Sequence, residues 1–81
     1  MSKNVINKLE YLDYLIKRKA TGNPKELAHK LNISERGVYN YIGLLKELGA
    51  SIKFCRKRNS YHYTEEGQFY FKFLHSDSLS Q

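Results

Sequence analysis

The chain lacks the residues and segments that build disulfide-bonded, zinc-binding or membrane-spanning proteins. Its 81 residues include a single cysteine, Cys55, which can form no intramolecular disulfide and gives no zinc framework. A lone thiol fits a reducing compartment. No apolar run is long enough to span a membrane, and the first residues lead into an amphipathic pattern rather than the apolar core of a signal peptide. We therefore expect a cytoplasmic protein.

Arrangements typical of catalytic and metal sites are also missing. The sequence has no pair of acidic residues in helical register, no glycine-rich phosphate-binding loop and no nucleophile elbow. Its three histidines, His29, His62 and His75, lack ligand-like spacing. Cys55 and His62 could face each other across a hairpin, but two groups do not make a metal site. We expect no enzyme activity, no metal and no cofactor.

What the chain does have is positive charge on a small domain. The formal net charge is +6 and the isoelectric point is near 9.5, which suits a polyanionic partner. Eighty-one residues form one domain with a small core. We expect this domain over residues 1–74, followed by a disordered polar tail over residues 75–81. We expect no second domain that would hold a small-molecule ligand.

Two amphipathic helices joined by a short turn are predicted in the middle of the sequence. The first begins at Pro24, which fits the first turn of a helix, and ends before Asn32, where the turn requires left-handed backbone. Ser34 offers an N-cap oxygen for the second helix, which should run to about Leu48 and end at Gly49. A three-residue turn between two such helices indicates a helix-turn-helix.

A further helix is predicted over residues 3–20. Val5, Leu9, Leu12 and Ile16 recur at helical spacing and form its core stripe, while Asp13 faces away. In the helix that begins at Ser34, the inward-facing residues are Val38, Tyr41, Ile42, Leu45 and Leu48.

After Gly49 the apolar period changes from 3.6 to 2, which predicts strands. Residues 52–55 and 61–64 form a hairpin with its tip at 56–60. Alternation from Phe69 to Leu74 predicts a third strand that covers the hairpin, extends its edge or forms a dimer interface. The fold class is therefore mainly α with a small antiparallel β hairpin or three-stranded sheet.

On these motifs, the chain resembles the winged helix-turn-helix domains of bacterial transcriptional regulators, in particular the deoxyribose-operon-repressor-like and biotin-operon-repressor-like group. The resemblance covers residues 5–64 and implies a winged helix-turn-helix fold and DNA binding. The residues in register with the group are Glu26, Leu27, Ala28, Leu31, Ser34, Arg36, Val38, Tyr39, Ile42, Leu45 and Gly49. Gly37, Asn40 and Tyr41 replace the usual Thr, Arg and Asp, so a phosphate-contacting hydroxyl and one basic contact are missing.

Arg36 and Asn40 are the candidates for contact with bases. A helix in the major groove presents residues near its N-terminus to base edges, where arginine suits guanine and asparagine suits adenine. For Arg36 the alternatives are a phosphate contact or a surface ion pair with Glu35 or Glu47. For Asn40 the alternative is an exposed, uncommitted amide.

Four more residues are candidates for contact with the DNA backbone. Tyr39 could hydrogen-bond a phosphate or pack over the preceding helix, and Gly37 lets the backbone approach the phosphates. Lys25 and Ser34 lie near helix N-termini, where phosphates commonly bind. Their alternatives are ordinary solvation and capping.

The hairpin tip carries three adjacent cations, Arg56, Lys57 and Arg58. This composition is typical of a DNA-contacting wing, and the alternative is a solvated loop.

The sequence thus predicts sequence-specific binding of double-stranded DNA by a small transcriptional regulator. The alternative is a winged-helix protein–protein interaction module without specific DNA binding, and RNA binding is a third, weaker hypothesis. Because one recognition helix covers only a few base pairs, we expect a homodimer. Its interface would be the segment from Phe69 to Leu74 or the outer side of the first helix.

Overall fold

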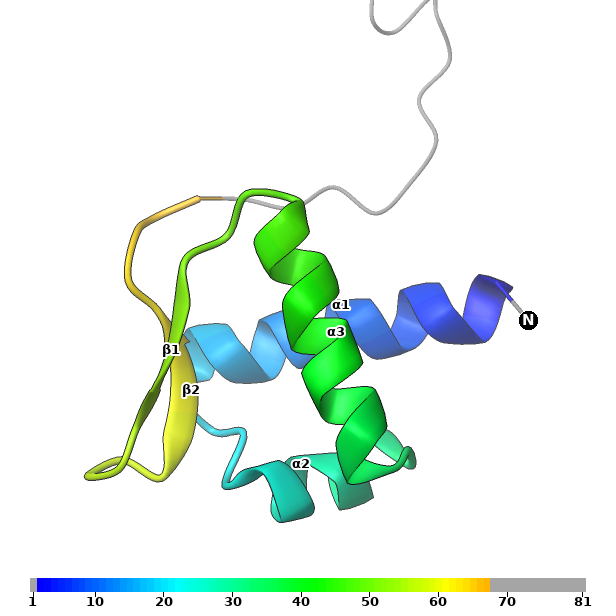
Figure 1. Cartoon of the computed structure of the whole chain (residues 1–81), viewed down its shortest axis with the longest axis horizontal. Helices are drawn as coiled ribbons and strands as arrows, with labels where there is room; N and C mark the ends of the chain where they lie inside the picture. Colours follow the sequence, from blue (N-terminus) through cyan, green and yellow to red (C-terminus); the bar gives the residue numbers. More distant parts are fainter. Residues whose placement is uncertain (1, 68–81) are drawn as a thin grey trace, which may run out of the picture.

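Three helices and a two-stranded hairpin follow one another along the chain (Figure 1). The computed structural model describes residues 2–67. The elements are α1 (Ser2–Arg18), α2 (Pro24–Leu31), α3 (Glu35–Glu47), β1 (Ile52–Cys55) and β2 (Ser60–Tyr63). The predicted order and the mainly helical, winged helix-turn-helix class are confirmed, with a two-stranded antiparallel sheet in this part of the chain.

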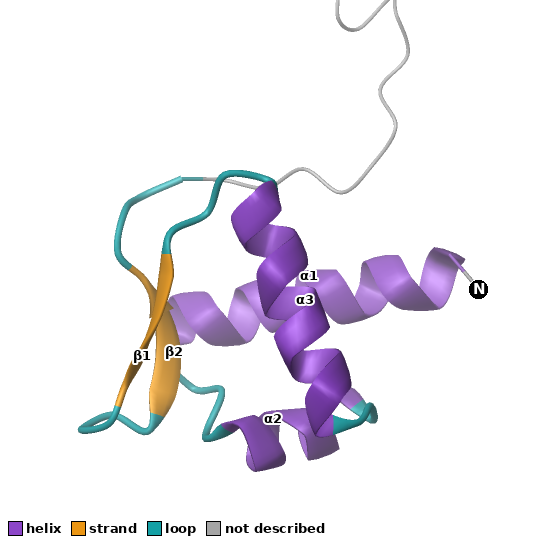
Figure 2. Ribbon diagram, viewed as in Figure 1, coloured by secondary structure: helices purple, strands orange, loops and turns teal. Residues whose placement is uncertain are grey.

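The core lies where the three helices and the hairpin meet. In Figure 2, α3 crosses in front of α1, α2 lies across the N-terminal end of α3, and the hairpin packs against the C-terminal end of α1. Each helix contributes one apolar stripe and the hairpin closes the side that the helices leave open. The buried apolar residues are Leu9, Leu12, Leu15, Ile16, Leu27, Ala28, Leu31, Val38, Ile42, Leu45, Ile52 and Tyr61.

The turn between α2 and α3 has the predicted conformation. Asn32 lies in the left-handed region (φ 57°, ψ 49°), and its backbone N–H donates to the carbonyl oxygens of Ala28 and His29. Ser34 caps α3, since its Oγ accepts a hydrogen bond from the backbone N–H of Gly37 at 3.0 Å. These local contacts fix the angle at which α3 leaves the turn.

The prediction for α1 was wrong at two positions. Asp13 does not face away from the core but is buried, because β2 packs on this side of α1 and the Tyr63 hydroxyl donates a hydrogen bond to Asp13 Oδ1. Lys17 Nζ lies 3.5 Å from the other carboxylate oxygen. Val5, predicted as core, is exposed because the N-terminal half of α1 extends beyond α3 (Figure 1).

α1 ends two residues earlier than the sequence pattern predicts, whereas the end of α3 agrees with the prediction to within one residue. α1 ends at Arg18 because Lys19 adopts a left-handed conformation (φ 55°). α3 ends at Glu47, and Leu48 is its C-cap with φ −81° and ψ 1°. Leu48 therefore leaves the apolar face of α3 and is exposed, so its prediction as an inward-facing residue was wrong.

The hairpin register separates the two residues considered as a metal pair. Cys55 lies opposite Ser60, and His62 lies opposite Lys53. Cys55 and His62 therefore do not face each other. The predicted strand from Phe69 to Leu74 and the predicted tail over residues 75–81 lie outside the described residues.

Candidate nucleic-acid interface

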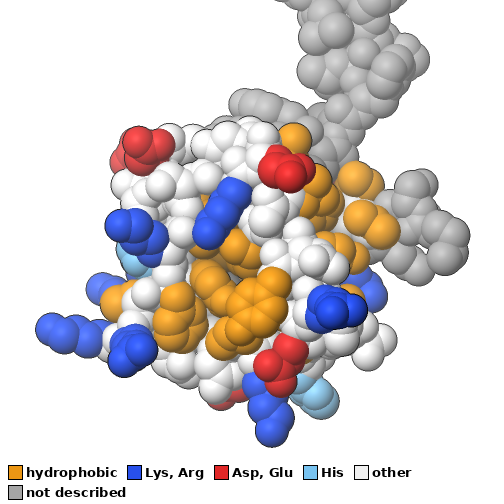
Figure 3. Space-filling model, in the orientation of Figure 1, with side chains coloured by type: hydrophobic (Ala, Val, Ile, Leu, Met, Phe, Trp, Pro, Cys, Tyr) orange, Lys and Arg blue, Asp and Glu red, His pale blue; other side chains and the backbone are white. Residues whose placement is uncertain are grey.

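The exposed side of α3 and the hairpin belong to one face of the molecule, which Figure 3 shows. Lysine and arginine side chains are distributed over this face, several of them on the hairpin side, and acidic side chains lie on it as well. Hydrophobic side chains gather in the region where α3 and the hairpin lie next to each other. Cationic side chains on the face that exposes a helix suit a duplex, whose phosphates flank its grooves.

Arg36 and Asn40 lie one turn apart on α3, and both are exposed. Within residues 2–67 neither side chain takes part in a hydrogen bond or an ion pair. The ion pair of Arg36 with Glu35 or Glu47, which the sequence left open, is therefore not formed. Both groups keep their full hydrogen-bonding capacity for a ligand.

Ser34 and Gly37, at the start of α3, bind each other. Because Ser34 Oγ accepts from the Gly37 N–H, that N–H is already paired. A Cβ at Gly37 would lie 3.3 Å from Cδ1 of Ile33, so the small residue also makes room for the turn. Ser34 thus acts as an ordinary cap, with its hydroxyl hydrogen still available to a phosphate.

Lys25 and Tyr39 are both exposed, Lys25 in the first turn of α2 and Tyr39 on α3. The ammonium group of Lys25 has no hydrogen-bond or ion-pair partner in the described part of the chain. Tyr39 lies close enough to Tyr61 of β2 to influence its ionisation. The sequence predicted that Tyr39 contacts a phosphate or packs over α2. It did not predict that Tyr39 lies close to Tyr61.

The three cations of the hairpin tip are all exposed. Arg56, Lys57 and Arg58 form no ion pair within residues 2–67. Asn59 closes the turn with left-handed backbone (φ 53°), and its N–H donates to the carbonyl oxygen of Arg56 at 3.2 Å. The tip therefore presents three unpaired charges from one short turn, as a phosphate-contacting wing requires.

A hydrogen bond that the sequence did not predict joins this tip to α2. Asn59 Nδ2 donates to Glu26 Oε1 at 2.9 Å, and the same oxygen accepts from the N–H of Asn23, the N-cap of α2, at 2.8 Å. The Asn23 and Asn59 hydrogen bonds lower the pKa of the Glu26 carboxyl. The ionised carboxylate thus stabilises this contact above the usual glutamate pKa, and the stabilisation is lost as the pH falls through the lowered value.

A second, buried connection holds the base of the tip. Thr21 and Ser60 are fully buried, and Ser60 Oγ accepts from the Thr21 N–H at 3.0 Å. Thr21 Oγ1 accepts from the Tyr61 N–H at 2.9 Å, and the two hydroxyl oxygens lie 3.1 Å apart. Nothing local in the sequence marks these two hydroxyls, because their partners are about forty residues apart. They fix the hairpin to the α1–α2 loop.

Replacement of Ser60 by alanine is expected to destabilise the domain. The Thr21 N–H would stay buried without its acceptor, which costs about 1–3 kcal/mol of unfolding free energy. Urea unfolding followed by circular dichroism measures this loss. Thr64→Ala is the matched control, since Thr64 forms an exposed hydroxyl pair with Ser51 and should change stability by less than about 0.5 kcal/mol. Equal losses in the two variants would show that the buried connection has no special role.

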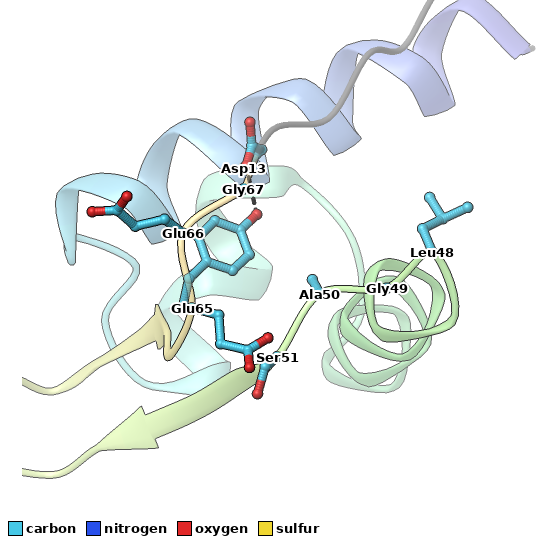
Figure 4. Close-up of a pocket in the computed structure, with 9 residues that line it drawn as sticks. Asp13, Leu48, Gly49, Ala50, Ser51, Glu65, Glu66 and Gly67 are labelled. Atoms are coloured by element: carbon cyan, nitrogen blue, oxygen red, sulfur yellow. Dashed lines mark hydrogen bonds between the residues drawn. The ribbon is translucent and has the colours of Figure 1, made fainter.

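A cavity near the C-terminal end of α3 is acidic. It has a volume of about 140 Å³, and its lining includes Asp13, Tyr63, Glu65 and Glu66 but no lysine or arginine (Figure 4). Burial raises the pKa of the Tyr63 hydroxyl, and its hydrogen bond to Asp13 raises it further. Tyr63 therefore remains a neutral donor to Asp13. Such a cavity repels phosphates, so it lies outside the candidate interface.

Residues 2–67 contain no candidate metal site and no candidate membrane span. No three histidine, cysteine, aspartate or glutamate side chains there gather in a group that could hold a metal ion. Among the helices of this region, none combines the length and the apolar character needed to cross a bilayer.

Comparison with known proteins agrees with this geometry. The model of a family described as an HTH domain matches residues 7–63, which include α2, α3 and the hairpin. Neither the curated proteins nor the solved structures contain a match to the chain. The matched region covers more than half of the chain. The chain therefore belongs to the HTH domain family, a family of helix-turn-helix DNA-binding domains found in bacterial regulators.

Proposed function

We propose that this protein is a small transcriptional regulator of the bacterial cytoplasm that binds specific sequences in double-stranded DNA. In this proposal α3 lies in the major groove and the hairpin tip contacts the backbone or the minor groove. The protein uses no cofactor and catalyses no reaction.

One observation carries the proposal. Arg36 and Asn40 are exposed and unpaired on α3, and the hairpin tip carries three exposed, unpaired cations. The exposed side of α3 and the hairpin lie on one face of the molecule (Figure 3). The first pair can distinguish base edges, and the second group can neutralise phosphates. A protein-interaction module would need no such division between hydrogen-bonding and cationic residues.

The connections of the hairpin support the same proposal. The Glu26–Asn59 and Thr21–Ser60 hydrogen bonds tie the tip to α2 and to the loop before it. A wing held in a fixed orientation to the recognition helix loses less conformational freedom when both bind at once.

Selection of bound sequences from a random duplex pool at near-physiological salt tests the function. We expect enrichment of a short motif, repeated as a palindrome if the protein binds as a two-fold dimer. An unenriched pool bound without sequence preference would contradict sequence-specific regulation. A protein that binds no duplex would favour the interaction module.

We also propose that the protein forms a homodimer, because a single module contacts too few base pairs for strong discrimination. One candidate interface is the outer side of α1. There Tyr11 and Tyr14 are exposed and stacked, with ring centroids 6.3 Å apart, and Arg18 lies over the Tyr14 ring at 5.3 Å. The other is the apolar segment from Phe69 to Leu74.

Light scattering at micromolar concentration should give twice the 9.5 kDa chain mass. Tyr14→Glu and Phe71→Glu distinguish the two candidate interfaces. Each introduced glutamate should dissociate the dimer only if the dimer interface includes the substituted residue. A monomer both free and bound to a half-site would overturn the homodimer.

A further inference from the structure

Two exposed aromatic residues and one buried one meet between α3 and the hairpin. Phe54 of β1 lies opposite Tyr61 of β2, and their rings make an edge contact with centroids 5.1 Å apart and an interplanar angle of 71°. Tyr61 is 8% exposed and belongs to the core, whereas Phe54 is 37% exposed. The core therefore continues to the surface through this pair.

Tyr39 extends this surface onto α3. Its side chain is 57% exposed. Burial raises the pKa of the Tyr61 hydroxyl, and the Tyr39 phenol raises it further, so the two hydroxyl groups are close enough to interact electrostatically. We name Tyr39, Phe54 and Tyr61 the aromatic patch. Figure 3 shows hydrophobic side chains gathered at the centre of this face.

The surroundings of the aromatic patch point to a nucleic-acid ligand rather than an apolar one. Arg36 lies one turn before Tyr39 on α3, and the cations of the hairpin tip follow directly after β1. One turn beyond Tyr39, a Cβ at Gly43 would meet nothing within 4 Å, so the patch borders open space on α3. The ligand must therefore combine negative charge with a small apolar group that can approach the helix closely.

We propose that the aromatic patch binds the 5-methyl group of thymine in the major groove and so selects thymine at one or two positions of the site. Thymine is the base that presents a large apolar group at the major-groove edge, while the flat faces of paired bases are covered by stacking. This inference rests on the proposed binding of duplex DNA by α3.

Deoxyuridine substitution tests the inference, because uracil keeps every hydrogen bond of thymine and lacks only the methyl group. With the duplex obtained by selection, replacing the contacted thymine should weaken binding by about fourfold, the factor for burial of one CH₂-sized group. Tyr39→Ala and Phe54→Ala should each bind the thymine and uracil duplexes equally. Both side chains lie at the surface, so both variants are expected to fold, which circular dichroism checks.

Leu48→Ala is the matched control. Leu48 is an exposed apolar residue at the C-cap of α3, outside the aromatic patch, and its loss should leave the fourfold preference unchanged. Duplex binding without any preference for thymine over uracil would overturn the inference while leaving the proposed function intact. Tighter binding to unpaired than to paired DNA, lost in Phe54→Ala, would instead assign base stacking to the patch and overturn it. Failure to bind any duplex would overturn the proposed function itself.

Discussion

Replacing Arg56, Lys57 and Arg58 together with alanine is expected to weaken duplex binding and to flatten its dependence on salt. Each cation that neutralises a phosphate releases condensed counterions, so its loss lowers the slope of log K against log salt by about 0.9. Loss of all three contacts lowers the slope by up to about 2.7. Fluorescence anisotropy with a labelled duplex, measured from roughly 50 to 200 mM salt, gives the slope directly. The base preference should stay unchanged, because phosphate contacts carry no sequence information.

A matched control removes the same charge from positions outside the hairpin. Lys8→Gln, Lys19→Asn and Lys30→Gln together take away three cations of α1, α2 and the loop between them, and asparagine tolerates the left-handed backbone at position 19 (φ 55°). This variant should bind with nearly the slope of the parent. If the slope of log K against log salt falls by the same amount in both variants, the net charge of the protein governs binding and the hairpin tip makes no specific contribution. A wing variant with the slope of the parent would show that the tip does not contact DNA.

Sequence reasoning succeeded where a feature depends on neighbours along the chain. Asn32 was predicted in the left-handed turn, Pro24 in the first turn of α2 and Ser34 as the cap of α3, and the structure confirms all three. The exposure of Arg36 and Asn40 followed from the same helical period. The caps of α2 and α3 and the turn between these helices could therefore be predicted from the sequence.

Features that depend on distant partners could not be predicted in this way. Asp13 is not part of the apolar stripe of α1, so the sequence pattern predicts that it faces solvent. In the structure its carboxylate accepts a hydrogen bond from the hydroxyl of Tyr63, fifty residues later in the chain. The contact of Glu26 with Asn59 likewise joins two polar residues that each have a sufficient local explanation, one in a capping box and one in a turn. Phe54 has the sequence pattern of an ordinary strand residue, and only the structure shows its edge contact with the Tyr61 ring.

Replacement of Arg36 or Asn40 by alanine is expected to change which sequences are bound, and not only how tightly. Both side chains are free in the described region and lie one turn apart on α3, so each can form two parallel hydrogen bonds with one base edge. Loss of such a contact should reduce discrimination at one or two base positions by about 1–3 kcal/mol, or roughly 5- to 150-fold in affinity. Binding curves for the selected duplex and its single-base variants, with each protein, measure this change.

Lys46→Ala is the control, because loss of an exposed cation in the last turn of α3 should weaken binding to all sequences alike. If Arg36→Ala or Asn40→Ala lowers the affinity for selected and random duplexes by the same factor, that residue contacts the backbone, and base recognition must come from elsewhere on α3.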